Sequence, residues 1–265
     1  MINQKSDYTR MNRKKKKPAP IIIANWKMNG TLIDSMQLFK DLRKQIHESL
    51  VGCEIVICPP FTLLRDFAEK VPGTGVKLGG QNCHHAHHGA FTGEISAMQL
   101  KDMMCDYVIV GHSERRIQSS EGSELVQKKA AHAHTEKLTT IICIGETQYE
   151  HDNDLTKIII REQLLHSIPK SANNSNTIIA YEPVWAIGTG KTPTDEQISS
   201  THQYIKKIIA EELPHIEDSL RIVYGGSVNK DNAQELLAND HVDGLLVGKS
   251  SLNMIDFWGI IDAAS

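Results

Sequence analysis

The chain has 265 residues, of which 40% are hydrophobic and 23% charged, and its net charge at pH 7 is −3. These values describe an ordinary globular protein and give no reason to expect nucleic acid as a partner. The longest apolar runs have the length of strands, so no membrane-spanning segment is expected. Five cysteines without a C-x-x-C pair argue against a disulfide framework and favour a reduced, cytoplasmic protein.

The first twenty residues differ from the rest. Residues 1–20 are polar, end in the basic run 13–17 followed by Pro18, and contain no apolar core of the kind that a secretory signal needs. We expect a disordered extension, with a tether to nucleic acid or an anionic surface as the alternative. The predicted fold therefore covers residues 21–265 as one domain.

Short β-branched runs recur along that domain. They are continuous apolar runs more than strict alternations, which is typical of strands buried on both faces of a parallel sheet. The eight runs are residues 21–24, 55–57, 76–78, 107–110, 140–144, 177–180, 221–224 and 244–247.

Segments with helical spacing lie between these runs. Apolar residues three and four positions apart predict helices over 32–46 and 198–209, and Thr194 followed by two acids supplies a helix start for the second. Alternation of strand and helix eight times favours an α/β fold of the (β/α)8 barrel type. Spacing alone leaves an open, doubly wound sheet as the alternative.

Three side chains with catalytic chemistry follow separate strands. Lys27, His112 and Glu182 come after the first, fourth and sixth runs, and the active sites of (β/α)8 barrels lie at the carboxyl ends of the strands. Taken alone, each of the three could equally be an ordinary residue of the surface or of the barrel rim. Together they predict proton transfer at one site.

The segment after the sixth run combines an acid with a flexible loop. Glu182 precedes Pro183, and residues 188–190 read Gly-Thr-Gly, whose backbone N–H groups can fold around an anion. Trp185, Ala186 and Ile187 are expected to form an apolar cover that excludes water. The predicted substrate is therefore a small phosphorylated molecule.

Seven stretches in the same order resemble the triosephosphate isomerase family, from about residue 21 to the end. They are residues 25–30, 81–83, 89–94, 111–116, 143–146, 181–191 and 224–228. The resemblance implies a TIM barrel that interconverts dihydroxyacetone phosphate and D-glyceraldehyde 3-phosphate through an enediolate. It also implies a homodimer that uses neither cofactor nor metal.

The resemblance assigns roles to the residues of the mouth. Glu182 is the expected base, and His112 is expected to act at the two substrate oxygens as a neutral imidazole facing a helix start, an arrangement well known in this family. Lys27 is expected to stabilise anionic charge. Asn25 would position Lys27, and Glu114 would be its ion-pair partner.

Backbone amides are expected to hold the phosphate. By resemblance they belong to Gly188, Ser227, Gly248 and Lys249. Lys249 stands where the family commonly has a second glycine. We therefore predict a local backbone that an L-residue can adopt, with the ammonium directed away from the phosphate.

The loop after the third run carries four histidines at 84, 85, 87 and 88. In the family this loop docks into the partner subunit, and Thr92 and Gly93 would reach the neighbouring active site. The histidines are too closely spaced to form one tetrahedral metal site by themselves, so we expect a polar interface loop.

Two other functions remain open at this point. One is another phosphate-binding barrel, such as a sugar-phosphate epimerase, which usually needs different acids or metal ligands at the strand ends. The other is a catalytically silent barrel that binds partners through its basic tail. The presence of Lys27, His112 and Glu182 together argues against the silent barrel.

Overall fold

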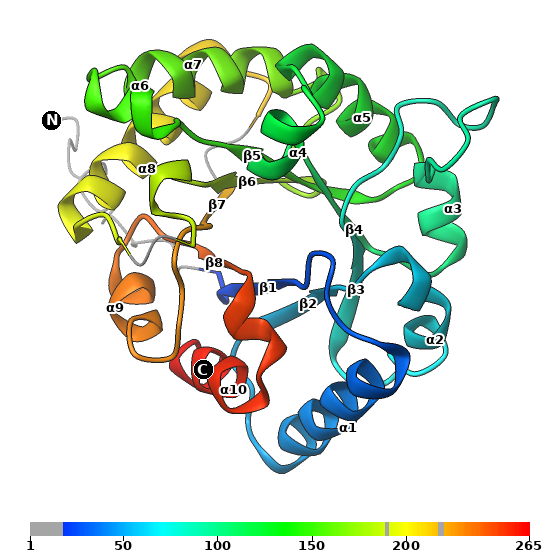
Figure 1. Cartoon of the computed structure of the whole chain (residues 1–265). Helices are drawn as coiled ribbons and strands as arrows, with labels where there is room; N and C mark the ends of the chain where they lie inside the picture. Colours follow the sequence, from blue (N-terminus) through cyan, green and yellow to red (C-terminus); the bar gives the residue numbers. More distant parts are fainter. Residues whose placement is uncertain (1–17, 189–190, 217–219) are drawn as a thin grey trace, which may run out of the picture.

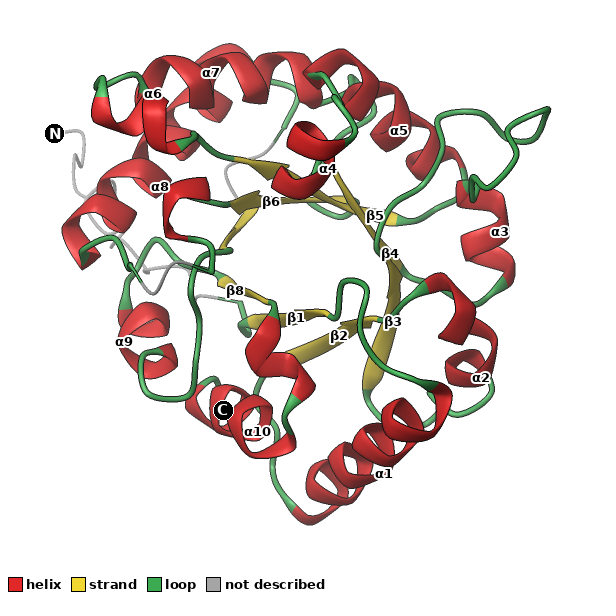
Figure 2. Cartoon of the chain, in the orientation of Figure 1, coloured by secondary structure: helices red, strands yellow, loops and turns green. Residues whose placement is uncertain are grey.

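The computed structural model describes residues 18–188, 191–216 and 220–265. Most of the predicted N-terminal extension lies outside the described residues, and so do Thr189 and Gly190 of the predicted lid. Eight parallel strands are arranged in chain order around a closed barrel (Figures 1 and 2). The strands are β1 (Ile21–Asn25), β2 (Glu54–Cys58), β3 (Val76–Gly80), β4 (Tyr107–Val110), β5 (Thr139–Ile144), β6 (Thr177–Tyr181), β7 (Arg221–Tyr224) and β8 (Gly244–Val247).

The closure of the sheet decides between the two predicted architectures. Strand β1 pairs in parallel with β2 on one side and with β8 on the other. An open, doubly wound sheet would leave two unpaired edges, so that alternative is excluded. The predicted (β/α)8 barrel is confirmed, and each of the eight apolar runs lies within a strand.

Helices surround the barrel (Figure 2). They are α1 (Leu32–Glu48), η1 (Phe61–Leu63), α2 (Leu64–Ala68), α3 (Ala97–Asp102), α4 (Ser113–Gln118), α5 (Ser123–Thr135), α6 (Gln148–Asp152), α7 (Thr156–Ser167), η2 (Val184–Ala186), α8 (Asp195–Glu212), α9 (Ala233–Ala238), η3 (Lys249–Leu252) and α10 (Met254–Ala263). The two helices predicted from spacing are α1 and α8. Helix α8 begins as expected, because the Thr194 hydroxyl accepts the Gln197 N–H in a reciprocal capping box.

The strands divide the core in two. Alternate residues point into the barrel, where apolar side chains of seven strands form a closed inner cluster, and the others pack outward against the helices. Strand β3 contributes Gly79 to this inner wall. A β-carbon on Gly79 would lie 2.6 Å from the sulfur of Cys58, so the small residue allows the walls to approach.

The register between neighbouring strands is uneven. β5 and β6 are paired from Thr140↔Thr177 to Ile144↔Tyr181. β7 and β8 share a single register pair, Tyr224↔Leu245. The last two strands of the barrel wall are therefore the pair with the fewest paired residues.

All five cysteines are free thiols, and four of them are buried. Within the described residues, we find no helix with the length and apolar character needed to span a bilayer.

Candidate active site

A cavity of about 290 Å³ opens at the carboxyl ends of the strands. Most of the residues predicted for the site line it: Asn25, Lys27, His112, Glu182, Gly188, Ser227, Gly248 and Lys249. Glu114 does not line the cavity but contacts Lys27. The structure therefore brings residues from five strand ends to one place.

Glu182 is the first residue after β6 and is buried. A β-carbon on Gly145 would lie 1.7 Å from the Glu182 carbonyl oxygen. Only glycine at position 145, after β5, therefore leaves room for the backbone of Glu182. The carboxylate accepts hydrogen bonds from the Ser113 N–H at 3.0 Å and from His112 Nε2 at 3.0 Å. Burial raises the pKa of Glu182, but the hydrogen bonds and charge of His112 outweigh it, and the net pKa is lowered. The group is therefore an ionised carboxylate at neutral pH.

His112 is the N-cap residue of α4. Its Nδ1 accepts the backbone N–H of Glu114 at 3.2 Å, which places the proton of a neutral ring on Nε2, facing Glu182. The expected helix start at the ring is thus confirmed. Burial lowers the pKa of His112, but the Glu182 carboxylate overcomes this effect and the net pKa is raised. The helix start alone therefore does not set the protonation of the ring while Glu182 lies against it.

Lys27 is held in a conformation that side-chain-bearing residues rarely adopt. Its φ is 54°, in the left-handed region. Its N–H donates to Asn25 Oδ1 at 3.1 Å, and its carbonyl accepts from Gln81 Nε2 at 2.8 Å. The ammonium contacts Glu114 Oε1 at 2.6 Å. Asn25 and Glu114 thus contact Lys27 as expected, whereas no pattern in the sequence identified Gln81 as its support.

Four glycines also line the cavity, at positions 188, 225, 226 and 248. Gly188 has φ +69°, and a β-carbon on Gly226 would lie 2.0 Å from the Tyr224 hydroxyl oxygen. Lys249 begins η3 and is not among the described side-chain-bearing residues with positive φ. The prediction that its backbone suits an L-residue is therefore confirmed. The direction of its ammonium stays a prediction.

The loop after β6 differs in part from the predicted cover. Ile187 lines the cavity, but Trp185 and Ala186 do not. The Trp185 indole N–H instead donates to Glu146 Oε1 at 2.8 Å, and the Ala186 carbonyl accepts from Ser227 Oγ at 2.7 Å. Glu146 was not singled out from the sequence, although it follows β5 as the other site residues follow their strands. These bonds fix the start of the loop to the loops after β5 and β7.

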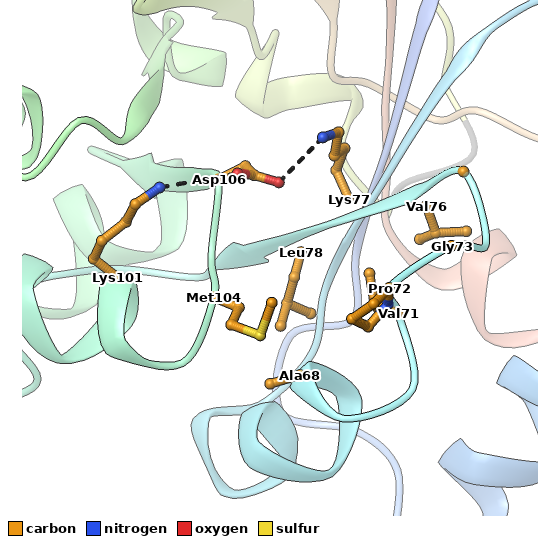
Figure 3. Close-up of a pocket in the computed structure, with 11 residues that line it drawn as sticks. Ala68, Val71, Pro72, Gly73, Val76, Lys77, Leu78, Lys101, Met104 and Asp106 are labelled. Atoms are coloured by element: carbon orange, nitrogen blue, oxygen red, sulfur yellow. Dashed lines mark ion pairs between the residues drawn. The ribbon is translucent and has the colours of Figure 1, made fainter.

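A second cavity, of about 430 Å³, lies beside the amino-terminal half of β3 (Figure 3). Its walls are mainly apolar, with Leu78 and Met104 among them. Its charged groups pair with one another, because Lys77 and Lys101 both face Asp106, at 3.6 and 3.9 Å. Although larger, this cavity lacks the converging acid, imidazole and amides of the cavity at the carboxyl ends.

Comparison with known proteins agrees with this geometry. The family model described as Triosephosphate isomerase matches residues 20–264. The triosephosphate isomerase of Mesorhizobium japonicum is 46% identical over 92% of this chain and 95% of the relative. That of Xanthobacter flavus is 44% identical over 92% of this chain and 97% of the relative. A crystal structure of triosephosphate isomerase from Bartonella henselae superposes with a TM-score of 0.83 at 37% identity and covers 92% of this chain and 98% of that one. The chain belongs to the triosephosphate isomerase family.

Proposed function

We propose that the protein is a triose-phosphate isomerase that interconverts dihydroxyacetone phosphate and D-glyceraldehyde 3-phosphate, a reaction of glycolysis and gluconeogenesis. The observation that carries this proposal is the convergence of Glu182, His112 and Lys27 on one cavity whose lining is rich in glycine. The reaction moves one proton between adjacent carbons and one between adjacent oxygens. A carboxylate and an imidazole placed side by side provide groups for both transfers.

Glu182 is the proposed base. In the resting site its pKa is lowered, so the substrate meets an ionised carboxylate, which removal of a proton from the carbon beside a carbonyl requires. In the resting site its oxygens are engaged by His112 and Ser113. A bound substrate must therefore displace the carboxylate from His112, after which it is free to accept the carbon proton and return it to the neighbouring carbon.

His112 is the proposed partner of the substrate oxygens. Its Nε2 proton, now directed at Glu182, would donate to the carbonyl oxygen once the carboxylate moves. The Glu114 N–H at Nδ1 favours the neutral ring, and the departure of the Glu182 charge removes what raises its pKa. Substrate binding therefore prepares a neutral imidazole to donate to the developing enediolate.

Lys27 is proposed to provide the positive field. Its ion pair with Glu114 and its constrained backbone fix the ammonium before substrate arrives. A charge held in place needs no reorganisation when the enediolate forms, so its stabilisation of the transition state is larger than that of a freely moving lysine.

The phosphate is proposed to bind to backbone amides of Gly188, Ser227, Gly248 and Lys249. These residues line the same cavity as Glu182 and come from the loops after β6, β7 and β8. Amides at tight turns bind anions without a charged side chain. This arrangement would hold the phosphate while leaving Lys27 for the reacting carbons.

We also propose a homodimer in the cytoplasm. The loop between β3 and α3 extends outward from the ring (Figure 1), and Phe91 of this loop is 43% exposed. Docking of this loop into a second copy would bury that ring. The free, mostly buried thiols suit a reducing compartment. Sedimentation should give twice the 29.6 kDa chain mass, and a fully active monomer would contradict the dimer.

A coupled assay tests the activity. Purified chain receives D-glyceraldehyde 3-phosphate, and formation of dihydroxyacetone phosphate is followed through its NADH-dependent reduction. We expect turnover that is lost in Glu182→Gln and is unaffected by a metal chelator. Turnover of the wild type no greater than that of Glu182→Gln would overturn the proposal, and turnover of a pentulose phosphate instead would indicate an epimerase.

A further inference from the structure

Three potential metal ligands meet away from the active site. His87 belongs to the loop after β3, whereas His132 lies in the last turn of α5 and Glu136 is the C-cap residue of that helix. One ligand atom of each lies within 4.8 Å of the others. None of the three lines the active-site cavity.

The contacts among the three show a common orientation. His132 and Glu136 are four residues apart, so one helix face presents both. His87 Nδ1 lies 3.1 Å from Glu136 Oε1, and the rings of His87 and His132 meet edge to face with centroids 4.2 Å apart. The loop histidine therefore lies against both helix residues at once.

His132 provides a second, independent observation. It is only 7% exposed, and its Nε2 has no hydrogen-bond partner among the described residues. A buried nitrogen without a partner costs free energy, and each such atom calls for an explanation. A ligand bound at this nitrogen supplies one.

The protonation of His132 suits a metal ligand. The Thr135 hydroxyl donates to the His132 carbonyl at 2.7 Å, so its oxygen lone pairs face His132 Nδ1, 3.4 Å away. Nδ1 is then the protonated nitrogen, and Nε2 carries a free lone pair. A neutral imidazole whose other nitrogen is hydrogen-bonded is the usual metal-binding form.

We propose that His87, His132 and Glu136 bind a divalent transition-metal ion of the zinc type, with solvent in the remaining position. Two imidazoles and one carboxylate are a common ligand set for zinc. Zinc–nitrogen bonds of about 2.0–2.1 Å place tetrahedral ligands about 3.4 Å apart. His87 Nδ1 and Glu136 Oε1 already lie near this separation, at 3.1 Å, and all three ligand atoms lie within 4.8 Å of one another. The His87 side chain is 53% exposed and can adjust its position to the ion.

The four loop histidines alone are too closely spaced to enclose a metal. The structure places only one of them in the cluster and brings the other two ligands from α5, 45 and 49 residues further along the chain. Such a metal would tie the loop that we propose for dimer contact to the body of the barrel. Its role is to fix this loop, and no catalytic step depends on it.

Metal titration of the full chain, prepared without a histidine tag and stripped with chelator, tests the proposal. Co²⁺ alone is titrated and followed by its visible absorption, and Zn²⁺ then competes. We expect one saturable Co²⁺ per chain, displaced by Zn²⁺, and a rise in Tm on Zn²⁺ addition. His87→Ala should weaken binding by at least about tenfold, and Glu136→Gln should do the same.

His88→Ala is the matched control, since it removes an imidazole from the same loop outside the cluster. It should leave the affinity within about twofold. Circular dichroism of the metal-free variants checks that each is folded. Equal losses in His87→Ala and His88→Ala, or no saturable binding by the wild type, would overturn the site and leave a hydrogen-bonded water as the partner of His132.

Discussion

The two ends of the barrel use charged residues in opposite ways. At the amino end, Glu54 accepts the Tyr107 hydroxyl on one oxygen and contacts Arg221 Nη1 at 2.9 Å with the other. Each of these groups is matched within the barrel itself. At the carboxyl end, His112 and Glu182 contact each other through the atoms that we propose for catalysis. We expect the pairing at the amino end to serve stability, whereas we propose that the pairing at the carboxyl end is released when substrate binds.

The volume of a cavity does not show which end of the barrel holds the active site. The cavity beside β3 is larger than the one at the carboxyl ends, at about 430 against 290 Å³. Its two lysines both pair with Asp106, however, while the smaller cavity combines a strained Lys27 with an acid and an imidazole. The chemistry of the lining residues identifies the site better than its volume.

The largest expected effect comes from a substitution that impairs catalysis at the carboxyl end and leaves the amino end intact. Glu182→Asp withdraws the carboxylate by one methylene, which spoils its approach to the substrate carbon, and should lower kcat by about 10²-fold or more. The coupled isomerase assay measures this change. Urea unfolding should show little loss of stability, since the acid keeps its charge. Turnover close to that of the wild type would remove Glu182 from the role of base.

The converse substitution removes a charge pair at the amino end, so it should lower stability and leave catalysis intact. Glu54→Gln removes the charge that Arg221 and Tyr107 face, and we expect a loss of about 1–3 kcal/mol in the free energy of unfolding. The value of kcat should remain within about twofold. Urea unfolding and the coupled assay are compared with Glu69→Gln, an exposed acid that should change neither. A fall in kcat without a fall in stability would show that the two ends are not separable in this way.

Acid should act on the amino end through His134, whose ring contacts Thr140 at the start of β5. Burial lowers the pKa of His134 to about 4. The unfolded chain therefore binds a proton between about pH 6.5 and 4 that the folded chain does not, so stability falls as the pH falls through this range. With allowance for its partial exposure, we expect a loss of about 1–2 kcal/mol.

His134→Gln tests that effect, because it keeps hydrogen-bonding groups but cannot titrate. Urea unfolding at pH 7 and pH 4 should show a smaller acid-induced loss in the variant than in the wild type. Equal losses in the two proteins would mean that His134 does not couple folding to pH.

The smallest expected effect concerns Lys249. If its amide binds phosphate and its ammonium points away, Lys249→Ala should leave KM within about threefold, less than roughly 1 kcal/mol. Steady-state kinetics at low and high salt measure this. A rise in KM of tenfold or more that high salt reduces would make the ammonium itself a phosphate ligand.

The strands were predictable because each is buried on both faces and therefore reads as a continuous apolar run. The long helices α1 and α8 were predictable from their apolar spacing. Helices α2, α4 and α6 have five or six residues, too few for a helical period to be visible. The start of α4 after His112 was expected from the family resemblance, whereas α2 and α6 came only with the structure.

The site was predictable in its residues and less so in its contacts. Position after a strand identified Lys27, His112 and Glu182, and the family motifs pointed to the same three. The direct His112–Glu182 contact could not be predicted, because it depends on side-chain orientation. The left-handed backbone of Lys27 has no sign in the sequence, since glycine would be the expected residue there. The meeting of His87 with α5 depends on packing between elements 45 residues apart.

The small number of paired residues between β7 and β8 has a consequence for ligand binding. β7 and β8 share one register pair, and the loops that follow them contain Ser227, Gly248 and Lys249. A phosphate held by amides on both sides would bridge the joint where the wall has least backbone pairing. If these amides hold the phosphate as we propose, the substrate would act as a non-covalent crosslink between the last two strands. Occupancy of the site and stability of the barrel wall would then be thermodynamically coupled, so the phosphate that positions the triose would also reinforce the enzyme that turns it over.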